Sequence, residues 1–324
     1  MKRGPLPSHI DMPQVTVVMP LFNKEQDVER AIESVLVQTV DDFELIVVND
    51  GSTDNGPAKV KAFHDERIRM IDQRNAGVSV ARNCGITEAR ADLIAFLDAD
   101  DEWADDFLET ILNLREQFPR CDVFATNYFF CGDGYKRPAI IRRMPQNFRE
   151  GLLKDYFGVA AHSDPPLWTS AVGVTKRAIT SVGGFPVGVH SGEDLLTWAK
   201  LAANYEIAYA NRPCAVYWNP QTASDRPGRV PQNPDIVGEE LVRLIKETPT
   251  PRPEGIKAYI GLWHQMRAVI YVQLGDKKNA LDELKMTSAY SPSLKVYLLM
   301  LILKLPLPSP AKLLSVWRRF RRAF

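Results

Sequence analysis

Short apolar runs alternate with amphipathic stretches along the first 130 residues. The runs are continuous, as expected of strands with both sheet faces covered, and they fall at 15–19, 43–48, 68–71, 93–97 and 121–130. Between the first two runs, apolar residues recur at helical spacing: Val28, Ala31, Ile32, Val35 and Leu36. Such alternation predicts an α/β fold with a mostly parallel sheet and helices on both faces.

The pattern changes along the rest of the chain. We expect a hairpin turn at 132–134, a helix at 148–157, a strand at 170–174, a helix at 193–203 and strands near 207 and 216. Residues 219–235 contain four prolines and predict a loop over the site. Helices at 236–246, 255–274 and 277–289 and a basic tail follow. We therefore predict an extension at 1–14, an α/β domain at 15–220, and a proline-rich loop with a helical region at 221–324.

Composition and charge narrow the classes of protein. The 324 residues are 45% hydrophobic and carry 40 basic and 40 acidic side chains, which argues against a nucleic-acid-binding protein. The four cysteines form no C-x-x-C pair, so we expect neither a zinc site nor disulfides. The chain has no apolar stretch typical of a signal peptide or a membrane span. These features predict a cytoplasmic protein.

Polar residues gather where predicted strands end. Asp98-Ala99-Asp100-Asp101 follows one strand, Asn49-Asp50 ends another, and Pro20 and Asn23 follow the first. The carboxyl ends of parallel strands form the ligand crevice of such sheets. Carboxylates gathered there repel one another unless a cation lies between them, and Mg²⁺ or Mn²⁺ is the simplest candidate. The alternative is a capping cluster for the next helix.

Three further groups are candidates for chemistry, each with a structural alternative. Asp50 suits a base or a ribose, but also an Asx-turn beside Gly51. The Arg82 fork suits a phosphate or a base, although solvated arginines are common. Glu193 and Asp194 open a predicted helix, where acids also stabilise the helix dipole, and either suits a general base. His190 is a weaker candidate for the base. The sequence allows two roles, shaping an acceptor site or a purely structural one, for His162, Trp168 and Trp218.

Together these segments resemble glycosyltransferase family 2. The similarity lies in 17–23 (VVMPLFN), 31–39 (AIESVLVQT), 44–54 (ELIVVNDGSTD), 75–83 (NAGVSVARN) and 96–101 (FLDADD), in the family's order and spacing. It covers about the first 110 residues strongly and weakens through Gly183-Gly184-Phe185 and Gly192-Glu193-Asp194 to about 218. One departure is Phe22, where the family often has tyrosine.

The resemblance implies a GT-A-type, Rossmann-like fold and inverting transfer from a nucleotide diphosphate sugar. It implies a metal held by Asp100 and Asp98, with Asp98 also meeting the ribose or diphosphate. It further implies Asp194 as the base, with Glu193 as the alternative. The remaining implied nucleotide-sugar-binding residues are Pro20, Phe22, Asn23, Glu25, Asp50, Asn75 and Arg82. The expected cofactor is Mn²⁺ or Mg²⁺. A UDP-sugar donor and a saccharide or lipid-linked acceptor are the expected partners, in synthesis of cell-envelope polysaccharide or glycolipid.

Two other classes share part of this pattern. A haloacid-dehalogenase-like phosphohydrolase also has an apolar strand followed by D-x-D, but usually near the N-terminus, with Thr or Val soon after the second aspartate. A non-catalytic nucleotide-sugar-binding protein is expected to lack the metal or base acids, and both are present here.

The C-terminal tail, 305–324, alternates apolar anchors with basic residues. A basic amphipathic helix of this kind suits an anionic membrane surface, and the apolar run at 296–303 would deepen the contact without spanning the bilayer. The alternative is a helix packed on the rest of the protein. The first interpretation predicts peripheral association with the inner face of the cell membrane.

Overall fold

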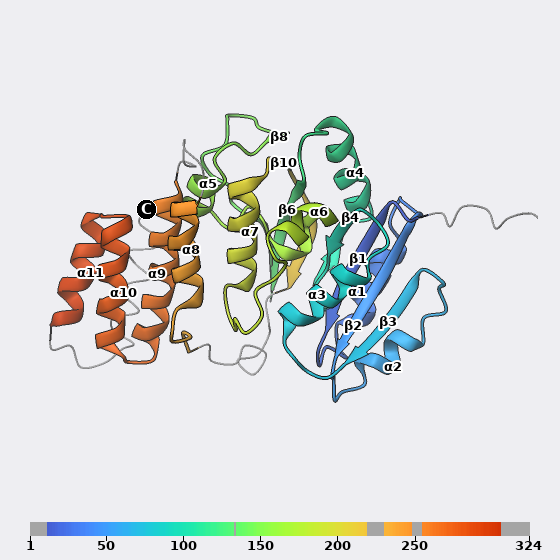
Figure 1. Cartoon of the computed structure of the whole chain (residues 1–324), viewed down its shortest axis with the longest axis horizontal. Coiled ribbons are helices and arrows are strands. Elements are labelled where there is room, and N and C mark those ends of the chain that lie inside the picture. Colours follow the sequence, from blue (N-terminus) through green and yellow to red (C-terminus); the bar gives the residue numbers. More distant parts are fainter. Residues whose placement is uncertain (1–11, 133, 219–229, 248–254, 306–324) are drawn as a thin grey trace, which may run out of the picture.

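The computed structural model describes residues 12–132, 134–218, 230–247 and 255–305 (Figure 1). The predicted basic tail lies outside the described residues except for Leu305. Most of the predicted N-terminal extension and of the proline-rich loop also lies outside them.

One mixed sheet forms the centre of the α/β part, with strands in the order β3-β2-β1-β4-β9-β6-β10-β5. β1 (Val15–Leu21) pairs in parallel with β2 (Phe43–Asp50) and β4 (Leu93–Phe96), and β2 pairs in parallel with β3 (Ile68–Gln73). β9 (Val172–Thr175) runs antiparallel between β4 and β6 (Val123–Gly132). β10 (Ile207–Trp218) is parallel to β6 and antiparallel to β5 (Glu102–Trp103) and β8 (Glu150–Leu152).

Helices cover both faces of this sheet, as predicted. α1 (Val28–Leu36) and α4 (Phe107–Gln117) share a buried apolar cluster with one face of β1. α3 (Val78–Glu88), α6 (Lys176–Ser181) and α7 (Glu193–Asn204) pack on the opposite face. Because β1, β2 and β4 are parallel, their carboxyl ends meet at one edge of the sheet, where the acidic segments lie.

Some predicted elements need correction. The expected helix at 148–157 is instead β8 followed by α5 (Tyr156–His162), because Asp155 caps a helix that begins only at Tyr156. The strand predicted from 170 begins at Val172, after the short 3-10 helix Thr169–Ala171. The two strands expected near 207 and 216 are one strand with register shifts between Ala210 and Ala215. The expected hairpin joins β6 to β7 (Tyr135–Pro138).

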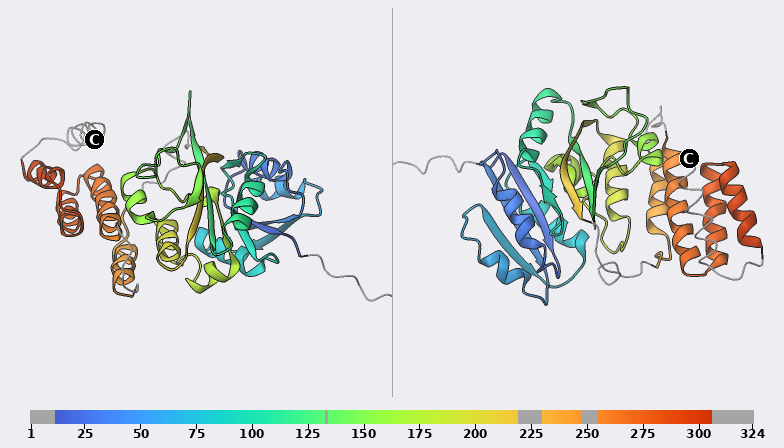
Figure 2. Two further views of the ribbon diagram at one scale, coloured as in Figure 1. Left: turned by 90° about the horizontal axis from the view of Figure 1, so that it is seen from above. Right: turned by 180° about the vertical axis from the view of Figure 1, so that it is seen from behind.

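The chain after the sheet is helical, as predicted. α2 (Gly56–Lys61) belongs to the sheet part, whereas α8 (Ile236–Glu247), α9 (Ile256–Gln273), α10 (Lys277–Tyr290) and α11 (Leu294–Lys304) stand side by side at the other end of the molecule (Figures 1 and 2). The pattern did not predict α11 as a helix. None of the described helices is long and apolar enough to cross a bilayer.

Candidate functional site

A cleft of about 610 Å³ lies at the carboxyl ends of β1, β2 and β4. Its floor comes from the sheet edge and from the first turns of α3, and its opposite wall from the start of α7, from β10 and from α9. Most of the predicted site residues line this cleft: Pro20, Phe22, Asp50, Asn75, Arg82, Asp98, Asp100, Glu193 and Asp194. Pro20 and Met266, which are 246 positions apart in the sequence, thus line the same cleft.

The cleft is strongly acidic. Six carboxylates line it against two cationic side chains, Lys24 and Arg82; the acids are Asp50, Asp98, Asp100, Asp101, Glu193 and Asp194. Like charges at this density raise one another's pKa unless a cation compensates them. The donor set consists of hard carboxylate oxygens, which suits a divalent cation such as Mg²⁺ or Mn²⁺.

Arg82 connects the two sides of the cleft. Its side chain is buried on α3, where Nη2 donates to Asp98 Oδ1 (2.7 Å) and Nη1 to Glu193 Oε1 (3.3 Å). The guanidinium also lies 4.9 Å above the ring of Phe185. Burial opposes the charge of Arg82, but the two carboxylates outweigh it and raise the pKa of the guanidinium. The planar fork of an arginine allows one side chain to make both contacts.

The three aspartates after β4 have different surroundings. Asp100 forms an ion pair with Lys24, with 2.6 Å between Oδ2 and Nζ. Asp101 is buried, and its Oδ2 accepts from Ser170 Oγ (2.5 Å) and from the Trp168 indole (3.1 Å). Burial raises the pKa of Asp98, and it raises that of Asp101 further. Asp101 therefore holds the 3-10 helix, whereas Asp98 and Asp100 line the cleft and could offer carboxylate oxygens to a cation.

Asp50 fixes a loop as well as lining the cleft. Its Oδ1 accepts from the backbone of Ala76 (2.8 Å) and from Gln73 Nε2 (2.7 Å), and its Oδ2 accepts from the backbone of Gly77 (2.9 Å). These bonds hold Asn75, which is exposed at the rim, and the start of α3. These contacts do not form the Asx-turn that was the alternative role for Asp50, because the carboxylate accepts hydrogen bonds from the loop before α3.

Asn23 and Glu25 do not line the cleft. Asn23 Oδ1 accepts from the backbone of Thr53 (2.8 Å), and Glu25 Oε2 accepts from the backbone of Asn55 (2.9 Å). Both side chains therefore tie the loop after β1 to the loop after β2. Asn23 has a φ of 51°, a left-handed conformation that asparagine tolerates better than most residues.

Glu193 and Asp194 begin α7 on the wall that faces the strand ends. Glu193 is committed to its ion pair with Arg82, whereas Asp194 Oδ1 accepts from the backbone of Leu195 (2.7 Å). Burial, reinforced by the neighbouring charge of Glu193, raises the pKa of Asp194 to about 6. A carboxylate with this pKa is ionised at neutral pH yet basic enough to accept a proton.

The sequence pattern did not predict that several other residues line the cleft. Trp168 and Tyr217 form a tilted aromatic pair on its wall, with ring centroids 4.6 Å apart, and Trp263 and Met266 reach it from α9. Of the aromatic and histidine candidates, Trp168 lines the cleft. Trp218, His162 and His190 do not, and the Trp218 indole donates to Glu102 (3.1 Å).

The fold is similar to that of two proteins solved with nucleotide sugars. S. aureus TarS, solved in complex with UDP-GlcNAc, is 15% identical with a TM-score of 0.69, and the match covers 86% of this chain and 82% of that one. The mannosyltransferase PcManGT from Pyrobaculum calidifontis, solved with GDP-Man and Mn²⁺, is 19% identical with a TM-score of 0.54, covering 90% and 80%.

The sequence is similar to one family over part of its length. Residues 16–166 match the model described as Glycosyl transferase family 2. A Rickettsia felis protein described as an uncharacterized glycosyltransferase is 30% identical over 196 residues, which are 60% of this chain and 31% of that protein. The chain therefore spans less than a third of that relative's length. Residues 16–166 thus match glycosyltransferase family 2, and the predicted GT-A-type fold is confirmed.

Proposed function

We propose that this chain is an inverting hexosyltransferase that moves a sugar from a UDP-sugar to an acceptor hydroxyl. The observation that carries the proposal is the single cleft that brings the carboxylates of the strand ends opposite those of α7. The TarS complex with UDP-GlcNAc supports a UDP-sugar as the donor. The acceptor that we propose is a saccharide or a lipid-linked saccharide, in the synthesis of cell-envelope polysaccharide or glycolipid.

The charge of the cleft supports dependence on a divalent metal. A diphosphate is itself anionic, and it meets six carboxylates and only two cations there. Asp98 and Asp100 would hold Mn²⁺ or Mg²⁺, which in the bound state offsets the charge of the diphosphate leaving group. PcManGT, solved with Mn²⁺, supports this assignment. Pro20, Phe22, Asp50 and Asn75 would surround the nucleoside.

Asp194 is the base that the geometry favours over Glu193. The Glu193 carboxylate is paired with Arg82, whereas Asp194 combines a position on the cleft with a raised pKa. The acceptor oxygen bonds to the anomeric carbon as the bond from that carbon to the diphosphate oxygen breaks. Asp194 takes the hydroxyl proton, and the diphosphate leaves with the electron pair. Attack from the face opposite the leaving group inverts the anomeric centre.

Thermal unfolding with and without Mn²⁺ tests the donor and metal together. We expect UDP to raise the melting temperature only when Mn²⁺ or Mg²⁺ is present, and NAD and ATP to do so less. Slow hydrolysis of one nucleotide sugar in a panel would then identify the sugar. The match of residues 16–166 to glycosyltransferase family 2 favours a glycosyltransferase over the haloacid-dehalogenase-like phosphohydrolase. Binding of UDP with no turnover of any donor would instead favour the non-catalytic alternative.

We also propose that the chain associates with an anionic membrane surface. On α11, Leu294, Tyr297 and Leu301 are 75%, 52% and 59% exposed, and the helix contains no acidic residue. The sequence after α11 adds Lys312 and four arginines within 318–322. Apolar anchors with basic residues bind anionic lipid from the side, which would place the enzyme at the inner face of the cell membrane.

A further inference from the structure

Helix α9 reaches the cleft although it lies about 100 residues beyond the family match. Trp263 and Met266 line the cleft, and Trp263 is 7% exposed. The six-membered ring of Trp263 lies against Gly192, so that a Cβ at Gly192 would come within 2.5 Å of its Cζ3. Gly192 has a φ of 84° and immediately precedes Glu193 and Asp194. The tryptophan therefore supports the backbone of the turn that presents the proposed base.

Asp235 holds Trp263 in this position. The Trp263 indole N–H lies 3.0 and 3.1 Å from the two carboxylate oxygens of Asp235. Asp235 also caps α8, because its Oδ1 accepts from the backbone of Gly238 (3.0 Å). The Asp235 carboxylate is thus held by the first turn of α8, and it in turn holds the Trp263 ring of α9.

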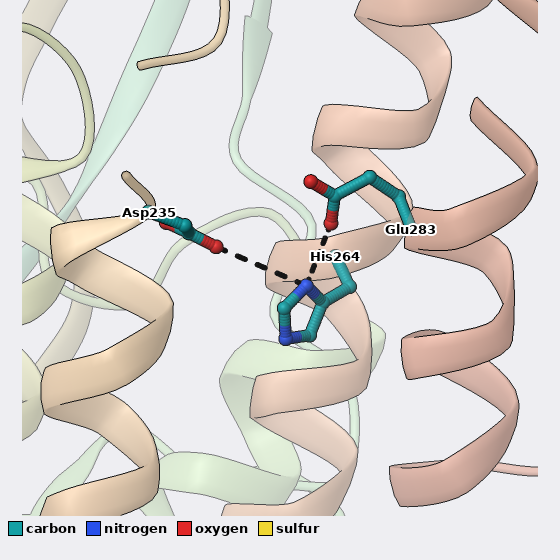
Figure 3. A group of neighbouring side chains, drawn as sticks. All are labelled: Asp235, His264 and Glu283. Atoms are coloured by element: carbon teal, nitrogen blue, oxygen red, sulfur yellow. Dashed lines mark hydrogen bonds and ion pairs between the residues drawn. The ribbon is translucent and has the colours of Figure 1, made fainter. Parts of the chain in front are cut away.

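A buried group of charged side chains in turn holds Asp235. Arg267 Nε lies 3.3 Å from Asp235 Oδ2 and 2.6 Å from Glu283 Oε1. His264 Nδ1 lies 2.7 Å from Glu283 Oε2, and Figure 3 shows this nitrogen facing both carboxylates. Arg267, His264 and Glu283 are each no more than 9% exposed. This group joins α9 to α10 and to the start of α8.

Asp235, His264 and Glu283 could by position alone offer three ligands to a metal ion. Arg267 argues for an ion-pair group instead, because its guanidinium contacts both carboxylates and a metal would have to displace it. His264 Nε2 is buried without a partner among the described residues, but it points away from the carboxylates (Figure 3). The observed contacts already supply a positive charge between the two acids.

We propose that Trp263, held by Asp235 and this ion-pair group, is a positioning residue for the turn Gly192–Asp194. The inference rests on the proposed function, because it assigns Trp263 a role through the proposed base. It also implies that the helical C-terminal region is part of the working site. A shift of the turn by about 1 Å can cost about a hundredfold in rate.

Substitution of Trp263 separates positioning from overall stability. We expect Trp263→Leu to lower kcat for donor hydrolysis by about ten- to a hundredfold while the affinity for UDP with Mn²⁺ stays unchanged, because the ring contacts the turn at Gly192. Val272→Ala is the matched control: this valine is buried on the same helix in a separate apolar cluster, so only the melting temperature should fall. Equal kcat in the two variants would overturn the proposal. If the leucine variant does not fold, Trp263→Phe takes its place in the same comparison.

The conservative variant at Asp235 gives a second kinetic test. Asp235→Asn keeps an oxygen that accepts from the indole N–H, whereas Asp235→Ala removes it. We expect the asparagine variant to retain several-fold more kcat than the alanine variant. Equal loss in both would show that the carboxylate does not act through Trp263.

A double-mutant cycle tests the contact between Trp263 and Gly192 without an activity assay. Gly192→Ala is strained in every background because of its positive φ, but the overlap with the ring exists only while Trp263 is present. We expect Gly192→Ala to lower the melting temperature less in the Trp263→Leu background than in the wild type. Additive shifts would overturn the contact. If the cycle shows coupling but the wild type turns over no nucleotide sugar, the proposed function fails and the positioning of the turn stands.

Discussion

Lys24 and Arg82 are the two cationic side chains that line the cleft, and each is already paired with an acid. Lys24 pairs with Asp100, and Arg82 with Asp98 and Glu193. Neither is therefore available to a diphosphate without giving up a carboxylate. This balance supports the proposal that a divalent cation binds between the carboxylates of the cleft.

Replacing Asp100 by asparagine tests this balance. Asp100→Asn keeps the volume of the side chain but removes one charge, so we expect a folded protein whose activity falls by about a hundredfold or more and whose stabilisation by UDP no longer depends on Mn²⁺. Melting curves with UDP, with and without metal, and initial rates measure both effects. A variant that transfers sugar at nearly the wild-type rate with saturating metal would show that the metal assignment is wrong.

Replacing Asp194 tests the base. We expect Asp194→Asn to reduce kcat by about 10²- to 10⁴-fold and to leave donor binding intact, because a base acts on the acceptor. Rates and donor affinity by calorimetry measure the two separately. Glu193→Gln is the control, and it should cost less because Arg82 keeps its bond to Asp98. A loss of donor affinity as large as the loss of rate would instead place Asp194 in the nucleotide pocket.

The pKa of Asp194 also predicts how the rate depends on pH. Burial and the charge of Glu193 raise this pKa to about 6, and only the ionised form accepts the hydroxyl proton. The rate should therefore be constant above this pH and fall tenfold per unit below it. A profile of kcat/KM between pH 4.5 and 8 measures this. A flat profile through pH 6 would contradict the assignment, and circular dichroism at each pH excludes unfolding as the cause.

At the scale of elements, the pattern of apolar residues was enough to predict the strands in the first half of the sheet and most of the helices. β1, β2 and β4 are fully covered strands, and such strands give continuous apolar runs. β8 and α5 were missed because a three-residue edge strand has no periodicity to detect. Asp50, Asp98 and Asp100 were predictable because they lie at strand ends, and Glu193 and Asp194 because they open a predicted helix. Trp263 was not, since an aromatic residue on a buried helix has the same pattern wherever it points.

The close packing of α3 on β1 gives a prediction about stability. A Cβ at Gly85 would lie 2.3 Å from Val18 Cγ1, so Gly85→Ala forces the helix away from the sheet. We expect a loss of about 1–3 kcal/mol in the free energy of unfolding, despite the better helix propensity of alanine. Urea denaturation measures it. Thr87→Ala, exposed on the same helix, is the control and should stay within about 0.5 kcal/mol, and an equally small loss for Gly85→Ala would contradict the packing.

At the scale of the whole molecule, the proposed membrane contact lies at the end opposite the sheet, on α11 (Figure 1). We expect the full chain to float with vesicles rich in phosphatidylglycerol at low salt, and a chain without residues 305–324 to float less, because each basic residue near the surface adds about 1 kcal/mol. Neutral vesicles are the control. Equal flotation of both chains, or none of the full chain, would contradict the proposal.

The family match ends at residue 166, whereas the wall opposite the strand ends is built from Ser191 to Met266. If the proposed roles hold, the residues that bind the nucleotide and those that bind the acceptor are encoded largely in two consecutive segments of the gene. A lineage can then exchange the second stretch by recombination and acquire a new glycan product while it inherits the donor half unchanged. The ion pair between Arg82 and Glu193 joins the two stretches, so such an exchange must preserve it.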